Sequence, residues 1–364
     1  MDRRLWPWLL AFGLQAVSAA PGYRIETVAN GLDHPWSLAF LPDGVMLVTE
    51  RVGRLRVIEQ GTLREAPVAG VPAVFASGQA GLFEVLPDPE FASNRMLYLS
   101  YAHGDNDANG LRLARARFDG GELHDVVPIF SAQPLKRGSA HYGGRLAWLP
   151  DATLVIGVGD GFIHREAAQK LDSHFGKLVR IARDGAVPTD NPFVARPGAL
   201  PEIYSLGHRN PQALLFDREN GALYEHEHGP RGGDELNRIA AGKNYGWPLI
   251  THGIDYTGAR ISPWTERDGL EQPLLHWTPS IAPAGMTLYR GALFPSWRES
   301  LFVAALAEKS VRRVPMKNGV PGAQEILFTE LDERFRDVRE GPDGALYLLT
   351  DSDEGRVLRV LPAQ

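Results

Sequence analysis

The sequence of 364 residues contains no cysteine. Disulfide bonds, thiolate metal sites and iron–sulfur clusters are therefore excluded. A chain of this length can bury a large apolar core without such cross-links. The formal net charge is -6 and no block of basic residues is present, which argues against a nucleic acid as the partner.

The sequence also lacks an apolar run that crosses a membrane comfortably. The run from Leu5 to Val17 follows two arginines and precedes a pair of alanines. This order is typical of a secretory signal, whereas the run is short for a membrane span. We therefore predict a signal peptide in residues 1–20 and a single domain in 21–364, exported to the periplasm or secreted. An N-terminal anchor is the alternative.

Amphipathic helical stretches are scarce, and no low-complexity linker divides the chain. A weak repeat is present instead, in which apolar strands alternate with Pro-Asp-Gly-like and glycine turns. "WSLAFLPDGVMLVTERVGRLRVI" from Trp36 and "VREGPDGALYLLTDSDEGRVLRV" from Val338 are its clearest copies. This pattern is typical of antiparallel strands. Poorer copies begin at Leu82, Leu146, Ala213 and Met286.

Six copies, spaced about 45 to 75 residues apart, predict an all-β fold: a six-bladed β-propeller with four-stranded antiparallel blades. A β-sandwich with coincidental turns is the alternative. We expect the early strand from Tyr23 to Ala29 to pair with the last blade, which would close the ring and cover an exposed edge. Propellers place ligand sites where loops converge at one end of the central channel, so the chemistry should lie in loops of several blades.

Loops of different copies carry polar residues that can bind a ligand. They are Gln79 in "SGQAGLFEV", His141 in "SAHYGGRLAW", Arg209 and Asn210 in "SLGHRNPQALLF", and Arg334 and Arg336 in "ERFRDVREGPDG". Each alone has an ordinary structural explanation, such as a solvated strand face for the last two. Together, clustered guanidinium groups suit a ligand with several carboxylates, because their planar forks bind carboxylates through paired hydrogen bonds. A histidine among them can act as a base near neutral pH.

The stretch "EHEHGPRGGDELN", from Glu225 to Asn237, is dense in side chains that can bind metals. One interpretation is a transition-metal site with His226 and His228 as ligands. No third soft ligand is evident nearby. We therefore interpret both histidines as hydrogen-bonding residues of the strand and loop wall.

These segments, in this order, resemble the soluble PQQ-dependent sugar dehydrogenases, the glucose/sorbosone and aldose sugar dehydrogenase family. The resemblance runs from about Gly31 to the C-terminus through "GHRNPQ", "EHGPRGGDELN", "NYGWP" and "RFRDV…GPDG…LYLLTD". It implies a six-bladed propeller, in agreement with the repeat count. It also implies an enzyme that oxidises aldose sugars at C1 to lactones. Hydride would pass to pyrroloquinoline quinone (PQQ), and the electrons to an external acceptor that the sequence does not identify.

The resemblance assigns roles to the loop residues. His141 matches the catalytic base, which takes the proton from the anomeric hydroxyl group of the sugar. Arg209 matches a residue that stabilises charge on the quinone oxygen. Positions near the cofactor correspond to Gln79, Arg209, Asn210, Arg334 and Arg336, of which the last two would hold the PQQ carboxylates.

Calcium is the second implied cofactor. The catalytic ion of the family binds the carbonyl oxygens of a Gly-Pro pair, here Gly229 and Pro230, and oxygen ligands suit Ca²⁺. A separate structural ion corresponds to the side chains of Glu235 and Asp255 and the carbonyls of Tyr245 and Thr251, with Glu271 as a weaker candidate.

Two positions depart from the best-known glucose-oxidising members. Ala140 stands where an acid precedes the base, and Ala307 stands where a lysine contacts PQQ. Lys309 or another cation would have to replace that lysine. The loops on the substrate side are also shorter, which indicates the broader aldose-dehydrogenase branch with a loose sugar preference.

Two other functions stay open at this point. A calcium-dependent propeller lactonase would hydrolyse a related substrate without a quinone and without the arginine pair. A non-catalytic propeller would bind carbohydrate or protein, because this fold hosts many functions. Either a monomer or a homodimer is compatible with the sequence.

Overall fold

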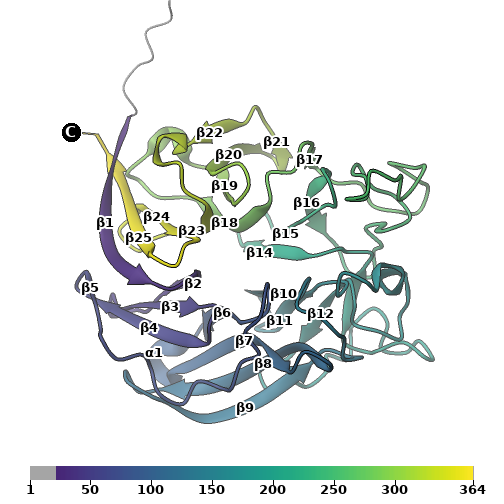
Figure 1. Ribbon diagram of the computed structural model, residues 1–364, viewed down its shortest axis with the longest axis horizontal. Helices are drawn as coiled ribbons and strands as arrows, with labels where there is room; N and C mark the ends of the chain where they lie inside the picture. Colours follow the sequence, from purple (N-terminus) through teal and green to yellow (C-terminus); the bar gives the residue numbers. More distant parts are fainter. Residues whose placement is uncertain (1–21, 364) are drawn as a thin grey trace, which may run out of the picture.

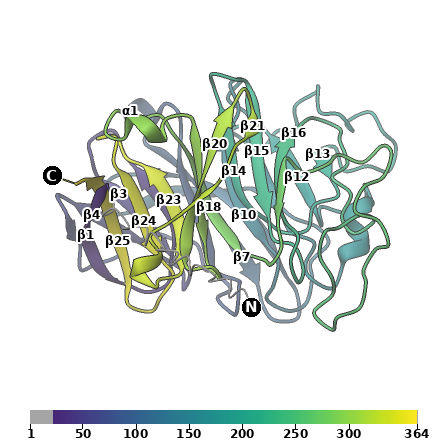
Figure 2. The same cartoon turned by 90° about the horizontal axis from the view of Figure 1, so that it is seen from above.

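A computed structural model describes residues 22–363 of the chain. The predicted signal peptide, residues 1–20, lies outside the described residues. Six antiparallel sheets follow one another around a central axis, and Figure 1 looks down that axis. From the side the molecule is a flat disc, with strands running obliquely between its two faces (Figure 2). Across 22–363, no helix combines the length and apolar character needed to cross a membrane.

Each sheet is one blade, and strands within it follow the chain order. The first three blades are β2 (Pro35–Phe40), β3 (Met46–Glu50), β4 (Arg54–Glu59) and β5 (Thr62–Leu63); β6 (Leu82–Pro87), β7 (Met96–Gly104), β8 (Asn109–Phe118) and β9 (Leu123–Ser131); and β10 (Gly143–Trp148), β11 (Leu154–Val158), β12 (Lys177–Ile181) and β13 (Ile203–Leu206). The fourth blade contains β14 (Pro211–Asp217), β15 (Ala222–Glu227), β16 (Asp234–Ile239) and β17 (Leu275–Trp277).

The last two blades depart slightly from this plan. The fifth contains β18 (Pro283–Tyr289), β19 (Ser300–Ala305) and β20 (Ser310–Lys317), with the short β21 (Val320–Pro321) and β22 (Glu325–Leu327) both pairing with β20. The sixth contains β23 (Phe335–Glu340), β24 (Leu346–Thr350), β25 (Gly355–Pro362) and, from the other end of the chain, β1 (Tyr23–Leu32). Helix in the described part is limited to α1 (Phe91–Asn94) and three short 3₁₀ turns: Arg165–Gln169, Pro295–Trp297 and Thr329–Leu331.

The predicted six-bladed propeller is therefore confirmed, and the sandwich alternative is excluded. Every predicted repeat copy contains the first strand of a blade: β2, β6, β10, β14, β18 and β23. Neighbouring first strands contact one another around the axis. The predicted ring closure is also observed, because β1 pairs antiparallel with β25, from Tyr23↔Pro362 to Leu32↔Gly355. In Figure 1 these are the adjacent purple and yellow strands.

The core lies between the faces of adjacent blades. Because each inner strand is covered on both faces, these strands are almost continuously buried, as β3 and β24 show. At the seam that closes the ring, Leu358 of β25 packs in a cluster with the fully buried Phe328 and Phe335. Packing between blades therefore supplies the apolar burial that a single four-stranded sheet cannot supply by itself.

The axis itself contains a buried ionic cluster. The Arg145 guanidinium is 2% exposed and lies 4.0 Å from the centre of the Trp36 ring. Its Nη1 is 3.6 Å from Glu84 Oε2 and 3.4 Å from Asp337 Oδ1, and Arg339 pairs with the same two acids. The two arginines and two acids balance in charge, and they join strands of three different blades.

We expect Leu358→Ala to lower the free energy of unfolding by about 2–5 kcal/mol, because deleting a buried leucine side chain leaves a cavity. Urea denaturation followed by circular dichroism measures this change. Val320→Ala, at a position that is 64% exposed, is the control and should stay within about 0.5 kcal/mol of the wild type. A loss as small in Leu358→Ala as in the control would contradict the described seam.

Candidate active site

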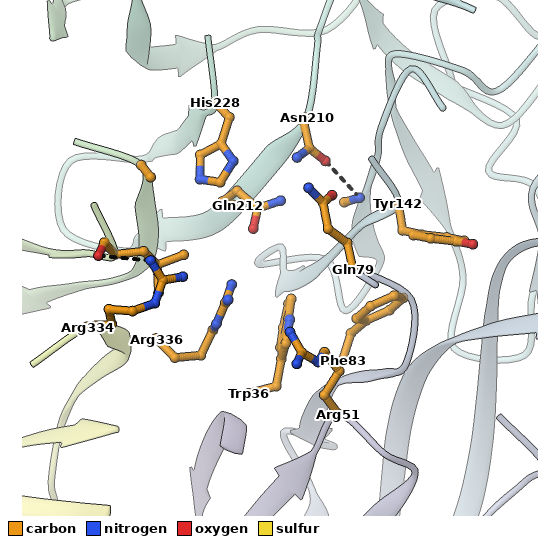
Figure 3. A pocket seen from close by; sticks show the side chains of 13 residues that line it. Trp36, Arg51, Gln79, Phe83, Tyr142, Asn210, Gln212, His228, Arg334 and Arg336 are labelled. Atoms are coloured by element: carbon orange, nitrogen blue, oxygen red, sulfur yellow. Dashed lines mark hydrogen bonds between the residues drawn. The ribbon is translucent and has the colours of Figure 1, made fainter. Parts of the chain in front are cut away.

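A cavity of about 240 Å³ opens at the axis, above Arg145, and residues of all six blades and their loops line it (Figure 3). Four predicted site residues are among its lining: Gln79, Asn210, Arg334 and Arg336. Figure 3 shows the two arginines on one side of the cavity and the two amides on the other. The remaining lining residues are Trp36, Arg51, Phe83, Tyr142, Gly143, Gln212, His228, Ala282 and Leu306.

The arginines make this cavity strongly positive. Arg334 precedes β23 and Arg336 lies within it, so the two side chains extend toward the same side of the strand. Asp351 Oδ2 pairs with both, at 2.9 Å from Arg334 Nη2 and 3.3 Å from Arg336 Nη2. Arg51 adds a third guanidinium. The Asp351 carboxylate thus lies among three guanidinium groups, those of Arg51, Arg334 and Arg336.

Arg336 retains hydrogen-bonding capacity. Its buried Nε has no hydrogen-bond partner. Burial lowers the pKa of the Arg336 guanidinium; Asp351 opposes that shift, while Arg145, Arg51 and Arg334 reinforce it. An arginine still carries its charge under such a shift. The site is therefore suited to a ligand with several carboxylates.

His141 lies directly beside the cavity and is 4% exposed. Its backbone N–H donates to Gln79 Oε1 at 2.9 Å, which fixes the amide against the loop. Its Nδ1 lies 2.7 Å from Asp160 Oδ1, which leaves Nε2 as the nitrogen that can accept a proton. Its φ of 54° is in the left-handed region, and a Cβ on Gly159 would lie 2.3 Å from the His141 carbonyl oxygen. Only glycine allows this close approach of the two loops.

Asp160 was missed by the sequence analysis, although it directly follows the strand β11 in "GVGDG". Its Oδ2 accepts a hydrogen bond from Trp247 Nε1 at 2.8 Å, and Oδ1 accepts one from the Phe162 N–H at 2.8 Å. Burial opposes ionisation of Asp160, but the hydrogen bond with His141, the charge of Arg209 and the Phe162 N–H outweigh it and lower the Asp160 pKa. Asp160 is therefore held as a carboxylate that orients the imidazole.

The imidazole of His141 is held neutral. Burial is the main cause that lowers its pKa, and the charges of Arg209 and Lys136 act in the same direction. Asp160 opposes this shift through its hydrogen bond and its charge. A neutral, oriented imidazole beside a ligand cavity has the properties of a general base.

Arg209 lies behind the main cavity and does not line it. Its Nη1 donates to the carbonyl oxygens of His228, at 2.9 Å, and Gly229, at 2.6 Å. Its guanidinium also lies 5.3 Å from the Trp247 ring and 3.4 Å from the Tyr256 hydroxyl. The carbonyl oxygen of Gly229, a predicted calcium ligand, thus accepts a hydrogen bond from the Arg209 guanidinium.

A second, much smaller cavity of about 10 Å³ brings several predicted metal ligands together. Gly229, Glu235, Tyr245 and Thr251 line it, together with Arg209 and Glu227. Burial and the charge of Asp234 raise the pKa of Glu235 to about 8, so this carboxyl group lacks a compensating cation.

Three predicted metal ligands lie elsewhere. The Asp255 carboxylate accepts hydrogen bonds from the backbone and hydroxyl of Thr257 and faces Arg165 at 3.6 Å. Pro230 lines an outer groove instead of the small cavity. Glu271, the weaker candidate, pairs with Lys243 at 2.9 Å.

Comparison with known proteins agrees with this arrangement. The model of the Glucose / Sorbosone dehydrogenase family matches residues 32–359. The chain belongs to this family. Aldose sugar dehydrogenase YliI of Escherichia coli is 42% identical over 355 residues, which cover 95% of each protein.

Solved structures of similar proteins support the same family. The apo-form of the soluble aldose sugar dehydrogenase from Escherichia coli is 41% identical, with a TM-score of 0.91 over 94% of this chain and 100% of that one. The PQQ-bound form of an aldose sugar dehydrogenase from Streptomyces coelicolor is 30% identical, with a TM-score of 0.76 over 94% and 99%. The predicted membership of the glucose/sorbosone dehydrogenase family is confirmed.

The structure also shows what surrounds the cavity in place of the lysine that is absent at Ala307. Lys309 lies at the surface, where its Nζ pairs with Asp332 at 2.8 Å, so it does not replace the lysine missing at Ala307. The cavity contains Arg51 as its additional cation. Arg51 carries no local sequence signal, because it ends a strand of the first blade and meets Arg336 only through the closed ring.

The two histidines of "EHEHG" differ. His228 lines the main cavity, and its Nε2 lies 2.7 Å from the Pro283 carbonyl oxygen, as expected for a hydrogen-bonding wall residue. Neither ring nitrogen of the fully buried His226 has a hydrogen-bond partner. The backbone of Gly285 lies close enough to act on the pKa of the ring, so a hydrogen-bonding role of His226 stays a prediction.

We expect the His141 pKa to lie below the ordinary value of 6.5, and to fall further in Asp160→Asn, which removes the group that raises it. Titration of the imidazole signals by nuclear magnetic resonance measures both values. Asp343→Asn, which alters an acid paired with Arg359, is the control and should leave the His141 pKa unchanged. A His141 pKa above 6.5, or one that does not respond to Asp160→Asn, would contradict the described pair.

Proposed function

We propose that this chain is a PQQ- and calcium-dependent dehydrogenase that oxidises aldose sugars at C1 to lactones, with loose sugar preference. The observation that carries the proposal is the cavity with three guanidinium groups and one carboxylate beside the His141–Asp160 pair. The PQQ-bound Streptomyces coelicolor relative and the aldose sugar dehydrogenase of Escherichia coli support the cofactor and the substrate class. We also propose export, directed by residues 1–20, and transfer of electrons to an external acceptor.

The lining residues fit a tricarboxylated quinone. The unpartnered Nε of Arg336 and the excess of positive charge suit its carboxylates, which Arg334, Arg336 and Arg51 would hold. Gln79 and Asn210 would hold the opposite side, where Asn210 Oδ1 is fixed by the Gly143 N–H at 3.2 Å. When bound, PQQ supplies two-electron acceptor chemistry that no side chain provides.

The remaining chemistry belongs to the chain. His141 Nε2 takes the proton from the C1 hydroxyl group of the sugar, and Asp160 stabilises the imidazolium that results. Arg209, which lowers the pKa of His141 and contacts the Gly229 carbonyl, places positive charge next to the reacting group.

The residues fit calcium in part. The carbonyl oxygens of Gly229 and Pro230 are donors that suit Ca²⁺, and Gly229 is held closely, since a Cβ there would lie 2.3 Å from Gly233. Its carbonyl already accepts from Arg209, so a catalytic Ca²⁺ would share that oxygen, which has two lone pairs. For the structural ion we propose Glu235 with the carbonyls of Tyr245 and Thr251, and we omit Asp255 because it faces away.

The purified protein, supplied with PQQ and Ca²⁺, should reduce an artificial dye when glucose or another aldose is added. His141→Ala should lower kcat by about 10²–10⁴-fold, because the base is lost, and should change PQQ affinity by only a few-fold. Dye reduction and a spectroscopic PQQ titration measure the two effects. Lactone hydrolysis without PQQ in a pH-stat would favour the lactonase alternative, and absence of PQQ binding would refute the proposal.

Arg336→Gln should weaken PQQ binding by about 10–100-fold, because a charge-assisted hydrogen bond to a carboxylate is lost. Lys309→Gln removes one positive charge at the surface and is the matched control, with unchanged affinity expected. Fluorescence titration of PQQ in the presence of Ca²⁺ measures both variants. Equal weakening in the two variants would indicate a general charge effect and would count against the proposed cofactor pose.

A further inference from the structure

Acidic side chains gather on one face of the fourth blade, apart from the main cavity. Glu225 and Glu227 alternate along β15, and they oppose Asn237 and Glu235 of β16 in the antiparallel register. Alternate residues of a strand and their cross-strand partners share a face. Three carboxyl groups and one amide therefore meet in a single patch.

This patch lacks a compensating cation. Glu225 is 0% exposed and Glu227 is 3% exposed. In residues 22–363, the one basic side chain within ion-pair distance of either is His208. Leaving buried carboxylates without a counter-charge is expensive, so such groups take up a proton or a metal ion.

The hydrogen bonds of the glutamates are incomplete. Glu227 Oε2 accepts from the backbone N–H groups of Arg209 and Asn210. Glu225 Oε2 accepts from Asn237 Nδ2 at 3.1 Å, whereas the buried Glu225 Oε1 and Asn237 Oδ1 have no partner. The acidic patch therefore contains more acceptor oxygens than donors.

His208 directs a free nitrogen at the carboxyl groups of Glu225 and Glu227. Its side chain is 0% exposed, and its Nε2 lies 2.8 Å from Ser205 Oγ. Its Nδ1 has no hydrogen-bond partner, and it lies 4.0 Å from Glu225 Oε2 and 4.0 Å from Glu227 Oε1. Burial, together with the charge of Lys177, lowers the pKa of His208 to about 3, so the ring is neutral and can offer a lone pair.

The three ligand atoms have the spacing of a metal site. They all lie within 4.8 Å of one another. Because two of these separations are 4.0 Å, a point about 2.0–2.5 Å from all three atoms exists, within the ~2.0–2.6 Å range of metal–ligand bonds. The contact between Ser205 and His208 Nε2 would hold the ring in the required orientation, as outer partners of metal-bound histidines do.

We propose that His208, Glu225 and Glu227 bind a divalent transition-metal ion, with Mn²⁺ the best fit. Carboxylates suit Mn²⁺, and the imidazole favours a transition ion over Ca²⁺. The site adjoins the calcium site at Glu235: Glu227 lines that cavity, whereas neither His208 nor Glu225 does. The bound ion joins β15 to the loop that carries Arg209 and Asn210, through the Glu227 carboxylate that both backbone N–H groups contact.

The test uses the full-length protein without PQQ or sugar, so it is independent of the proposed oxidation. Protein stripped with EDTA is dialysed into saturating Ca²⁺, and Mn²⁺ is then titrated while the electron paramagnetic resonance signal of free Mn²⁺ is recorded. We expect one Mn²⁺ per chain to be retained. Glu225→Gln should weaken that binding at least 10-fold, whereas Glu354→Gln, at an exposed position, should not change it.

Thermal unfolding provides a second measurement that a misfolded variant cannot imitate. Mn²⁺ should raise the melting temperature of the wild type and leave that of Glu225→Gln unchanged. Without metal, Glu225→Gln should be at least as stable as the wild type, because it removes a buried carboxyl group at nearly constant shape. Failure of the wild type to retain Mn²⁺, equal retention by Glu225→Gln, or displacement of Mn²⁺ by equimolar Ca²⁺ would each overturn the assignment.

Discussion

The buried guanidinium of Arg145 is the contact on which the centre of this molecule depends. Besides Glu84 and Asp337, it contacts backbone that carries the cavity lining: Nε donates to the Gln212 carbonyl at 2.8 Å, and Nη2 donates to the Arg336 carbonyl at 3.3 Å. Its plane also covers Trp36. A buried charge tolerates little movement, because each lost partner leaves an uncompensated group. The buried ion cluster therefore holds the backbone of Gln212 and Arg336, which forms the floor of the cavity, in place.

Above this floor, the ionisable groups fall into two zones. Three arginines make the main cavity positive, while Glu225, Glu227 and Glu235 gather acidic groups in the interior of the fourth blade. The segment of Arg209 and Asn210 runs between them: its backbone N–H groups donate to Glu227, and the Asn210 side chain lines the main cavity.

Local sequence patterns predicted the elements well, because period-two alternation and turn residues are properties of short segments. They located the first strand of each blade, the closing strand and the four predicted residues that line the cavity. They missed Arg51 and Asp160, whose roles arise only when distant loops meet at the axis. Asp255 shows the opposite case: the family resemblance implied an ion shared with Glu235, but the carboxylate of Asp255 is engaged in a local turn with Thr257.

The pairing of β1 with β25 has a consequence for folding during synthesis of the chain. The sixth blade takes strands from both ends of the described chain, so its outer edge can form only after β25 has been synthesised. Until then the first blade lacks its neighbour across the seam, and its apolar face around Leu38 and Val48 stays open to water. Such long-range pairing is slow to form. The ring can therefore close only after nearly the whole chain has left the ribosome. Until then β1 has no partner strand.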